Sequence, residues 1–263
     1  MLNFKLRIED IDSHDRGRDN SGVMIAIIDY GMGNLRSVQK AFEKMGYAAE
    51  VTRDPQRIEA APGVVLPGVG AFAACMNGLT ECGLVDTVYR VVDMGTPLLG
   101  ICVGMQILFS ESVEFGRVRG LDILEGQVVR FDPSAVNGGK IPHMGWNQLH
   151  IKRRTPHLAS ITEGAAVYFV HSYYPVPADP AIIATTTDYG GTEFTSSVCW
   201  RNVFATQFHP EKSQTVGLRI LENFGKLVSG EVGPRSPHLG YGNPHSGHGN
   251  PHAGVGHRNI HSV

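Results

Sequence analysis

The chain has 263 residues, of which 42% are hydrophobic and 18% are charged, and its formal net charge at pH 7 is −2. These values are ordinary for a globular protein and exclude a strong electrostatic attraction to nucleic acid or to an anionic membrane. No apolar stretch reaches the roughly 18–20 residues of a membrane helix, and the first residues lack the apolar segment of a secretory signal, so we expect a cytoplasmic protein.

The two ends of the chain differ in composition from its middle. Residues 1–22 are polar without a sustained period, so we expect a flexible leader. Residues 231–263 are rich in Gly, Pro, Ser and His and bury too little apolar surface to offset chain entropy, which predicts a disordered tail. The six histidines of this tail could bind a divalent metal loosely, although incidental histidines on a flexible tail are the simpler interpretation. The folded domain is therefore expected over residues 23–230.

Strand and helix signals alternate in the first half of that domain. The apolar run VMIAIID (23–29) predicts a buried strand, and after a Gly-Met-Gly turn the apolar residues from 35 to 45 recur at helical spacing up to the stop at Gly46. AAEVTR and GVVLPG are the next predicted strands. A helix is predicted around residues 79–92, PLLGI (97–101) is another buried strand, and residues 102–110 begin a helix.

The second half is predicted to consist mainly of shorter strands separated by Gly, Pro and Asn turns, until a helix over about 213–227 closes the domain. The strand segments are LDILEGQVVRF, WNQLHI, AAVYFVHSYY, AIIATTT, SSVCW and VFATQFH. Strand–helix alternation followed by several strands predicts an α/β fold with a central, partly parallel sheet and helices on both faces.

One of the four cysteines lies in an unusual setting. PLLGI followed by CVGMQILF places Cys102 at a strand-to-helix junction between Gly100 and Gly104, as in a nucleophile elbow. Glycines there remove the Cβ atoms that would crowd the turn and a bound substrate, and a helix N-terminus favours a thiolate. A structural cysteine in a core turn is the alternative. The other three cysteines are interpreted as small apolar residues with free thiols.

A base for this thiol is offered by FATQFHPEKS (204–213). Pro210 prevents a helix, so His209 and Glu211 are expected in extended chain with both side chains on one side, where the carboxylate can orient the imidazole. A surface His-Pro-Glu turn is the alternative. In GVVLPGVGAF (63–72) a glycine turn follows a strand, and it either presents a backbone N–H opposite that of Val103 as an oxyanion hole or is a plain β-turn.

Two further segments carry weaker signals. DYGMGNLRS has only two of the three glycines of a dinucleotide-binding turn, because Arg36 occupies the third position, so a tight turn with Asn34 and Arg36 open to a partner is preferred. In HMGWN (143–147) the tryptophan is either a core anchor or part of an interface, and its spacing does not decide between them.

Together these residues are similar to the class I (triad) glutamine amidotransferases. The signature G-x-C-x-G-x-Q stands here at residues 100–106 and H-x-E at 209–211. More narrowly, six blocks in the same order resemble the glutaminase subunits of imidazole glycerol phosphate synthases, over about residues 23–230: IDYGMGNLRSV, LPGVGAF, GICVGMQILFSES, KIPHMGWN, YFVHSYY and ATQFHPEKS. The resemblance implies a flavodoxin-like, three-layer α/β fold with a central, mostly parallel sheet and helices on both faces.

The resemblance also implies a reaction. Cys102 attacks the side-chain amide of glutamine, His209 gives the departing ammonia its proton, Glu211 orients His209, and the thioester is hydrolysed to glutamate. No cofactor and no metal are implied. The ammonia is expected to pass into a (β/α)8-barrel cyclase subunit, with which the chain forms a heterodimer that makes imidazole glycerol phosphate and aminoimidazole carboxamide ribotide in histidine biosynthesis.

The resemblance assigns further roles residue by residue. An oxyanion hole, after a peptide of its loop rearranges, is expected at Gly68, Val69, Gly70 and Val103. Contacts with the substrate glutamine are expected at Gly70, Gly104, Gln106, Glu114, Ser172 and Tyr173. Contacts with the cyclase or the tunnel mouth are expected at Asn34, His143, Met144, Trp146, Tyr168 and Lys212.

Two other functions compete with this interpretation. The chain could supply ammonia to a different synthase, such as that of pyridoxal phosphate, but the PHMGWN and DYGMGNLRS blocks argue against it. It could also be a non-catalytic binding subunit, which would normally have lost a triad member, whereas Cys102, His209 and Glu211 are all present.

Overall fold

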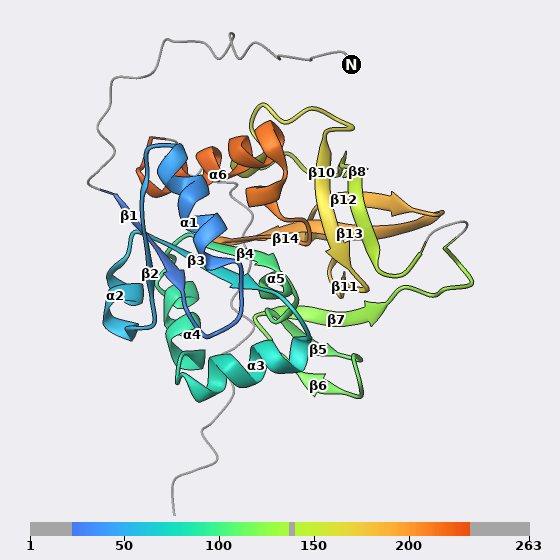
Figure 1. Cartoon of the computed structure of the whole chain (residues 1–263), viewed down its shortest axis with the longest axis horizontal. Coiled ribbons are helices and arrows are strands. Elements are labelled where there is room, and N and C mark those ends of the chain that lie inside the picture. The colour runs from blue at the N-terminus through green and yellow to red at the C-terminus, as the bar shows by residue number, and fades with distance from the viewer. Residues whose placement is uncertain (1–22, 137–139, 232–263) are drawn as a thin grey trace, which may run out of the picture. The chain divides into compact units, whose positions relative to one another are not determined.

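The computed structural model describes residues 23–136 and 140–231 (Figure 1). The predicted leader 1–22 lies outside the described residues, and so does the predicted tail 231–263 apart from its first residue. The boundaries of leader, domain and tail, and metal binding by the tail, therefore stay predictions.

The main sheet joins the first and last parts of the domain. Among the described residues, eight strands follow one another in the order β2-β1-β3-β4-β14-β13-β12-β9. The first five are parallel: β2 (Ala48–Thr52), β1 (Met24–Ile28), β3 (Gly63–Gly68), β4 (Leu98–Cys102) and β14 (Val203–Thr206). The last three are antiparallel: β13 (Thr192–Trp200), β12 (Ile183–Tyr189) and β9 (His150–Ile151). The predicted α/β fold with a mostly parallel sheet is confirmed.

Helices cover both faces of the parallel part. On one face lie α1 (Leu35–Lys44) and α6 (Gln214–Val228), and on the other lie α2 (Pro55–Ala60), α3 (Phe72–Glu81) and α4 (Val85–Asp93) (Figure 1). Strands enclosed in this way are apolar along their whole length, because every side chain enters a core. Accordingly Ile25, Ile27, Val64 and Val65 have no exposed surface. Burying each such side chain contributes about 1.5–3 kcal/mol.

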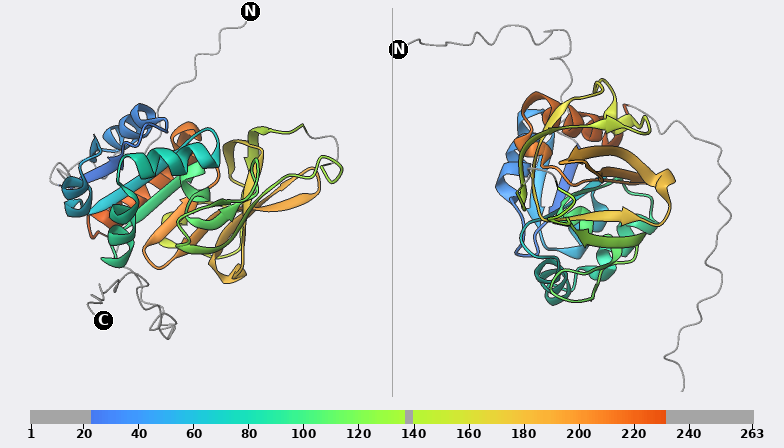
Figure 2. Two further views of the ribbon diagram at one scale, coloured as in Figure 1. Left: turned by 90° about the horizontal axis from the view of Figure 1, so that it is seen from below. Right: turned by 90° about the vertical axis from the view of Figure 1, so that its right-hand side faces the viewer.

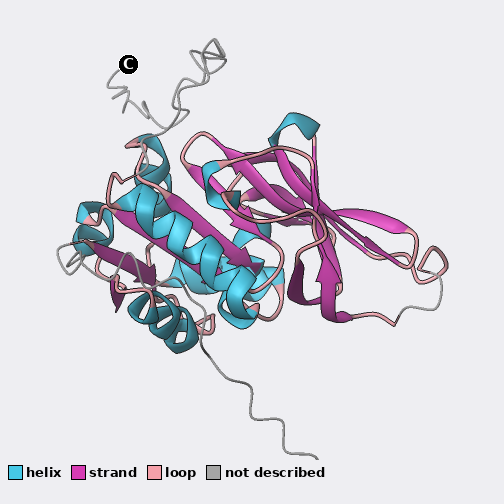
Figure 3. Cartoon of the chain, turned by 90° about the horizontal axis from the view of Figure 1, so that it is seen from above, coloured by secondary structure: helices cyan, strands magenta, loops and turns pink. Residues whose placement is uncertain are grey.

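Two smaller sheets stand beside this core. One has the order β11-β7-β5-β6, formed by β11 (Tyr173–Pro177), β7 (Leu124–Arg130), β5 (Phe109–Ser112) and β6 (Val118–Arg119). The other pairs β10 (Ala166–His171) with β8 (His143–Gln148). Helices gather around one half of the domain, and strands and loops form the other half (Figures 2 and 3). Single 3-10 turns occur at Pro156–Leu158 (η2), Pro180–Ile182 (η3) and Pro210–Lys212 (η4).

The single helix predicted around 79–92 is wrong, because the chain turns inside it. α3 ends at Glu81 and α4 starts at Val85, and between them Gly83 has a φ of +66°. The backbone N–H of Leu84 donates to the Leu79 carbonyl, which closes the last turn of α3 as a glycine C-cap does. Leu84 itself is fully buried, so the break anchors the turn in the core.

The helix predicted from residue 102 to 110 is a single turn, α5 (Val103–Gln106), and strand β5 begins only three residues later, at Phe109. The carbonyls of Ile107 and Leu108, which a longer helix would use internally, accept from the backbone N–H groups of Leu121 and Leu124. Pairing with a segment more than ten residues away in sequence therefore ends this helix. No helix of the described residues is long and apolar enough to span a membrane.

Candidate active site

Cys102 is the last residue of β4 and directly precedes α5. Its backbone has φ 56° and ψ −113°, a conformation that costs a non-glycine residue about 1–3 kcal/mol and that persists only where the surroundings enforce it. The residue is 3% exposed. β4 is a central strand, between β3 and β14, so the sharp turn places the thiol at the carboxyl edge of the parallel strands, where open α/β sheets bind ligands.

The glycines around Cys102 make room mainly for backbone. A Cβ atom on Gly104 would lie 1.9 Å from the Leu66 carbonyl oxygen, and one on Gly68 would lie 2.4 Å from the Gly104 nitrogen. A Cβ on Gly100 would be 3.0 Å from the Cβ of Ala205. The close approach of β3 to the first turn of α5 therefore requires glycine at positions 68 and 104. This is a more specific reason for the glycines than the predicted one, which was that they avoid crowding the turn at Cys102.

His209 and Glu211 lie beside Cys102. Glu211 is in the 3-10 turn η4, which corrects the predicted extended chain, while His209 at its start is extended with φ −97° and ψ 97°. The His209 Nδ1 and the Glu211 Oε1 are 2.9 Å apart. The turn is fixed on both sides, because the His209 N–H donates to the Tyr168 carbonyl at 3.0 Å and the Ser213 hydroxyl donates to the His209 carbonyl at 2.6 Å.

The electrostatics of His209 favour a charged imidazole. Burial lowers its pKa, but side-chain hydrogen bonds with Cys102 and Glu211 outweigh burial and raise the pKa to about 10. The side chains of His209 and Glu211 are 2% and 1% exposed, so the pair is shielded from water. The second carboxylate oxygen of Glu211, Oε2, is buried without a hydrogen-bond partner. The geometry thus provides a thiol, a base and an acceptor that orients the base.

Two glutamine side chains connect this group to the next strand. The Gln106 Nε2 donates to the Tyr173 carbonyl and to the Gln207 Oε1, at 2.9 Å in each case. The Gln207 Nε2 in turn donates to the Cys102 Sγ at 3.7 Å. Sequence reasoning did not single out Gln207. A signal was present, since Gln207 is a long polar residue within the mostly apolar run 203–208, and it is fully buried.

Two side chains donate hydrogen bonds to backbone carbonyls of the loop that is expected to form the oxyanion hole. The Tyr30 hydroxyl donates to the Pro67 carbonyl at 2.5 Å, and the Cys75 thiol donates to the Val69 carbonyl at 3.4 Å. Burial raises the pKa of Tyr30 well above its usual value and that of Cys75 to about 11, so both remain donors at neutral pH. Gly68 is the register partner of Cys102 in the β3–β4 pair, which brings the loop to the thiol.

The residues expected to contact glutamine lie on several different elements. The Glu114 Oε2 accepts from the Phe72 N–H at 2.6 Å, at the start of α3. Ser172 and Tyr173 lie at the junction of β10 and β11, and the Ser172 carbonyl accepts from the Phe131 N–H at 3.1 Å. Gly70, with a φ of +88°, is exposed at the end of its loop.

The residues expected at a partner differ in exposure. Met144 and Trp146 on β8 are 63% and 48% exposed, and the Trp146 ring meets that of Tyr168 edge-on at 6.1 Å. Lys212 is exposed in η4, and Asn34 is half-buried at the start of α1. His143, which directly precedes Met144 in sequence, is buried.

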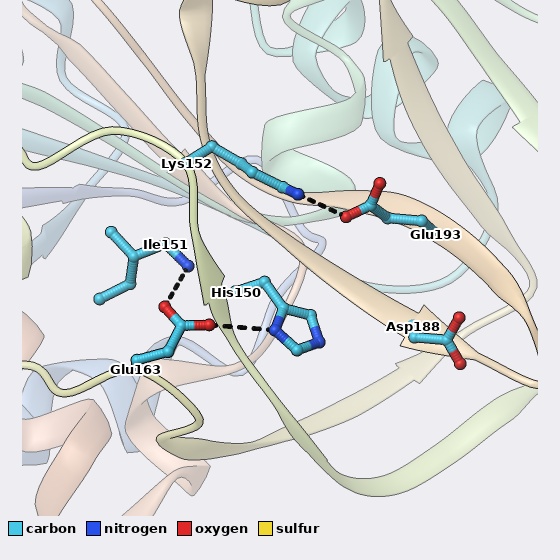
Figure 4. Close-up of a pocket in the computed structure, with 6 residues that line it drawn as sticks. All are labelled: His150, Ile151, Lys152, Glu163, Asp188 and Glu193. Carbon is cyan, nitrogen blue, oxygen red and sulfur yellow. Dashed lines mark hydrogen bonds and ion pairs between the residues drawn. The ribbon is translucent and has the colours of Figure 1, made fainter.

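A hollow of about 480 Å³ lies away from this group, on β9, β12 and β13. It is lined by His150, Ile151, Lys152, Glu163, Asp188 and Glu193 (Figure 4). The His150 Nδ1 lies 3.0 Å from Glu163, and the Lys152 Nζ lies 2.7 Å from Glu193. The carboxylates of Glu163 and Glu193 thus already have partners within this hollow.

Comparisons with known proteins find a matching family, relatives with similar sequences and structures with a similar fold. A model of the family described as glutamine amidotransferase class-I matches residues 26–227. The imidazole glycerol phosphate synthase subunit HisH of Geobacter sulfurreducens is 57% identical over 206 residues, which cover 77% of this chain and 98% of that protein. The subunit HisH of Syntrophotalea carbinolica is 58% identical over 207 residues, 78% of this chain and 100% of that protein. The structure of PurLQS from Thermotoga maritima, at 18% identity, covers 80% of this chain and 98% of that chain with a TM-score of 0.60, a likeness of fold.

Proposed function

The chain belongs to the class-I glutamine amidotransferases and, among them, to the HisH subunits of imidazole glycerol phosphate synthase, and from this membership we propose how its residues perform the reaction. It is an enzyme subunit that hydrolyses glutamine for imidazole glycerol phosphate synthesis in histidine biosynthesis, in a complex with a cyclase subunit. The cyclase is proposed to be a (β/α)8 barrel that forms a heterodimer with this chain.

Cys102 is the proposed nucleophile. Its sulfur attacks the side-chain carbonyl carbon of glutamine, His209 transfers the proton on Nε2 to the departing ammonia, and a thioester with Cys102 remains. His209 then takes a proton from water, the resulting hydroxide adds to the thioester carbon, and glutamate leaves as the thiolate is restored. Glu211 accepts from the His209 Nδ1 throughout, which fixes the tautomer and stabilises the imidazolium.

The oxyanion formed in each step is proposed to bind the backbone N–H groups of Val69 and Val103, with Gly68 and Gly70 giving the loop its path. The carbonyls of Pro67 and Val69 are anchored by Tyr30 and Cys75, so the Gly68–Val69 peptide lies between two fixed points. Rotation of this one peptide would direct the Val69 N–H toward the substrate. We propose this rotation as the step through which the cyclase raises glutaminase activity.

Substrate and partner contacts are proposed from the similarity to the family. Gly70, Gly104, Gln106, Glu114, Ser172 and Tyr173 are proposed to hold glutamine. Asn34, His143, Met144, Trp146, Tyr168 and Lys212 are proposed to form the cyclase side and the tunnel mouth, Met144 and Trp146 by direct contact because they are exposed. Ammonia passes at this tunnel mouth into the cyclase.

We also propose a cytoplasmic location. In that compartment the four unpaired cysteines, all within the described residues, stay reduced.

The observation that best supports this mechanism is the buried His209, whose Nδ1 lies 2.9 Å from the Glu211 Oε1 and whose pKa is raised by its interactions with Cys102 and Glu211. The alternative of supplying a different synthase loses support, since identity to the HisH subunits is 57–58% over almost their whole length.

The test is to mix the chain with its cyclase and to measure glutamine hydrolysis with and without the nucleotide ligand of the cyclase. We expect slow hydrolysis by the isolated chain and a large increase when cyclase and ligand are both present. Full activity of the isolated chain would contradict the proposed gating by the partner.

A further inference from the structure

His143 and His171 form a buried pair that the triad mechanism does not use. They are direct register partners in the β8–β10 ladder and are 2% and 6% exposed. Aromatic rings enclose them: the His143 ring stacks on Tyr189 at 4.0 Å and on Phe169 at 4.9 Å, and the His171 ring lies 5.0 Å from Phe194 and 5.3 Å from Phe131. Polar rings among aromatic ones are costly to bury unless their nitrogens are hydrogen-bonded.

All four ring nitrogens have hydrogen-bond partners. The bond of Asn147 at one end of the series determines which nitrogens donate and which accept. The Asn147 Nδ2 lies 2.7 Å from the Asp188 carbonyl, which only accepts, so this atom is the amide nitrogen. The same nitrogen lies 3.3 Å from the His143 Nε2, which must therefore accept. The hydrogen of the neutral His143 ring is then on Nδ1, and Nδ1 donates to the His171 Nε2 at 3.0 Å.

The inner end requires the same tautomers independently. The His171 Nδ1 lies 2.9 Å from the Tyr173 carbonyl, which again only accepts, so Nδ1 carries the hydrogen and Nε2 accepts. Both rings are neutral in this arrangement. In agreement, burial lowers the pKa of His143 to about 4 and that of His171 to about 3.

The chain of bonds continues to the nucleophile. The Tyr173 carbonyl also accepts from the Gln106 Nε2, which donates to Gln207, and Gln207 donates to the Cys102 Sγ. At its other end this series of bonds begins at Asn147 on β8, the strand whose opposite face carries the exposed Met144 and Trp146. A continuous series of hydrogen bonds thus links an exposed strand to the thiol.

We propose that His143 and His171 are positioning residues, whose one-way hydrogen bonds hold the Tyr173 carbonyl, and with it Gln106 and Gln207, in place against Cys102. The pair makes the arrangement of the site depend on the position of β8. This proposal rests on the proposed function, which assigns Tyr173 and Gln106 to glutamine binding and the exposed face of β8 to the cyclase.

The test uses the full chain in complex with the cyclase and compares synthesis from glutamine with synthesis from free ammonia. Phenylalanine keeps the ring packing and removes the hydrogen bonds, so His143→Phe and His171→Phe are each expected to lower kcat/KM for glutamine about five- to tenfold, chiefly through KM. In the His171→Phe complex synthesis from ammonia stays unchanged, because added ammonia does not depend on the glutaminase site. The double variant loses no more than the more affected single variant, because both residues act in one chain of bonds.

Two further variants separate positioning from general stability. His171→Asn retains a donor near the Tyr173 carbonyl and is expected to recover most of the KM lost in His171→Phe. His157→Phe is the matched control. His157 is also buried and stacked on an aromatic ring, Phe204 at 4.2 Å, but its side chain is not part of the series of hydrogen bonds that leads from Asn147 to Cys102. It should leave both rates unchanged.

Full glutamine activity in either single variant, additive losses in the double variant, or the same loss in His157→Phe would overturn the proposal. If the phenylalanine variants do not fold, Asn147→Ala removes the first donor at a half-buried position, and it should raise KM in the same way. Failure of the proposed function is recognised separately, because the wild-type complex would then make no product from glutamine.

Discussion

The buried His157 makes the stability of this protein sensitive to acid by an amount that can be worked out. Its ring stacks on Phe204 with an interplanar angle of 2°, and its Nδ1 is buried without a hydrogen-bond partner. Burial lowers its pKa from 6.5 to about 3. Because the folded pKa lies below the unfolded one, the unfolded state binds the extra proton, and stability is lost as the pH falls from 6.5 toward 3.

The size of the loss at pH 5 depends on the unfolded pKa alone, since pH 5 still lies well above the folded value. Each pH unit in this window costs about 1.4 kcal/mol per proton, so acidification from pH 8 to pH 5 destabilises the protein by about 2 kcal/mol through His157. His157→Phe keeps the stacking and removes the titration. It should therefore lose about 2 kcal/mol less than the wild type over the same interval.

The assay is urea unfolding of wild type and His157→Phe at pH 8 and pH 5, with the free energy of unfolding extrapolated to water at each pH. Every other residue is the same in both proteins, so its contribution cancels in the comparison. Equal acid losses in the two proteins, within about 0.5 kcal/mol, would refute the assignment of a neutral, buried His157.

Three other predictions concern the site. Glu211→Gln should lower kcat for glutamine about a hundredfold or more with little change in KM, because His209 loses the acceptor that orients it; an unchanged kcat would show that another group performs this task. Gly104→Ala should destabilise the chain by at least about 2 kcal/mol in urea unfolding, since its Cβ would lie 1.9 Å from the Leu66 oxygen, and wild-type stability would contradict the close approach of β3 to α5. Trp146→Ala should weaken cyclase binding by about 1–2 kcal/mol in calorimetry, and an unchanged affinity would remove Trp146 from the interface.

Local sequence patterns were sufficient to predict those helices and strands whose own apolar residues pack into the core. β1, β3 and β4 are short apolar runs, as parallel strands covered on both faces must be, and α1 follows the helical spacing of Val38 and Phe42. The strand-to-helix turn at Cys102 was predictable because the glycines around it are in the sequence. The reason for Gly104 was not, since the Leu66 carbonyl that it accommodates belongs to another strand.

Features that depend on distant pairing were missed. The helix predicted from residue 102 ends after one turn because its carbonyls bond to a segment near residue 121, and sequence periodicity carries no information on that contact. The link between Gln106 and Gln207 joins residues 101 positions apart, and that between His143 and His171 spans 28. In the sequence, His143 belonged only to a block expected at a partner, and only the β8–β10 register brings it against His171.

The most direct test of the central claim is the activity of the Cys102→Ala variant in complex with the cyclase. We predict that this complex makes no imidazole glycerol phosphate from glutamine and retains synthesis from free ammonia at high pH, since only the thiol that releases ammonia is removed. Continued glutamine turnover by this variant would contradict the assignment of Cys102 as the nucleophile.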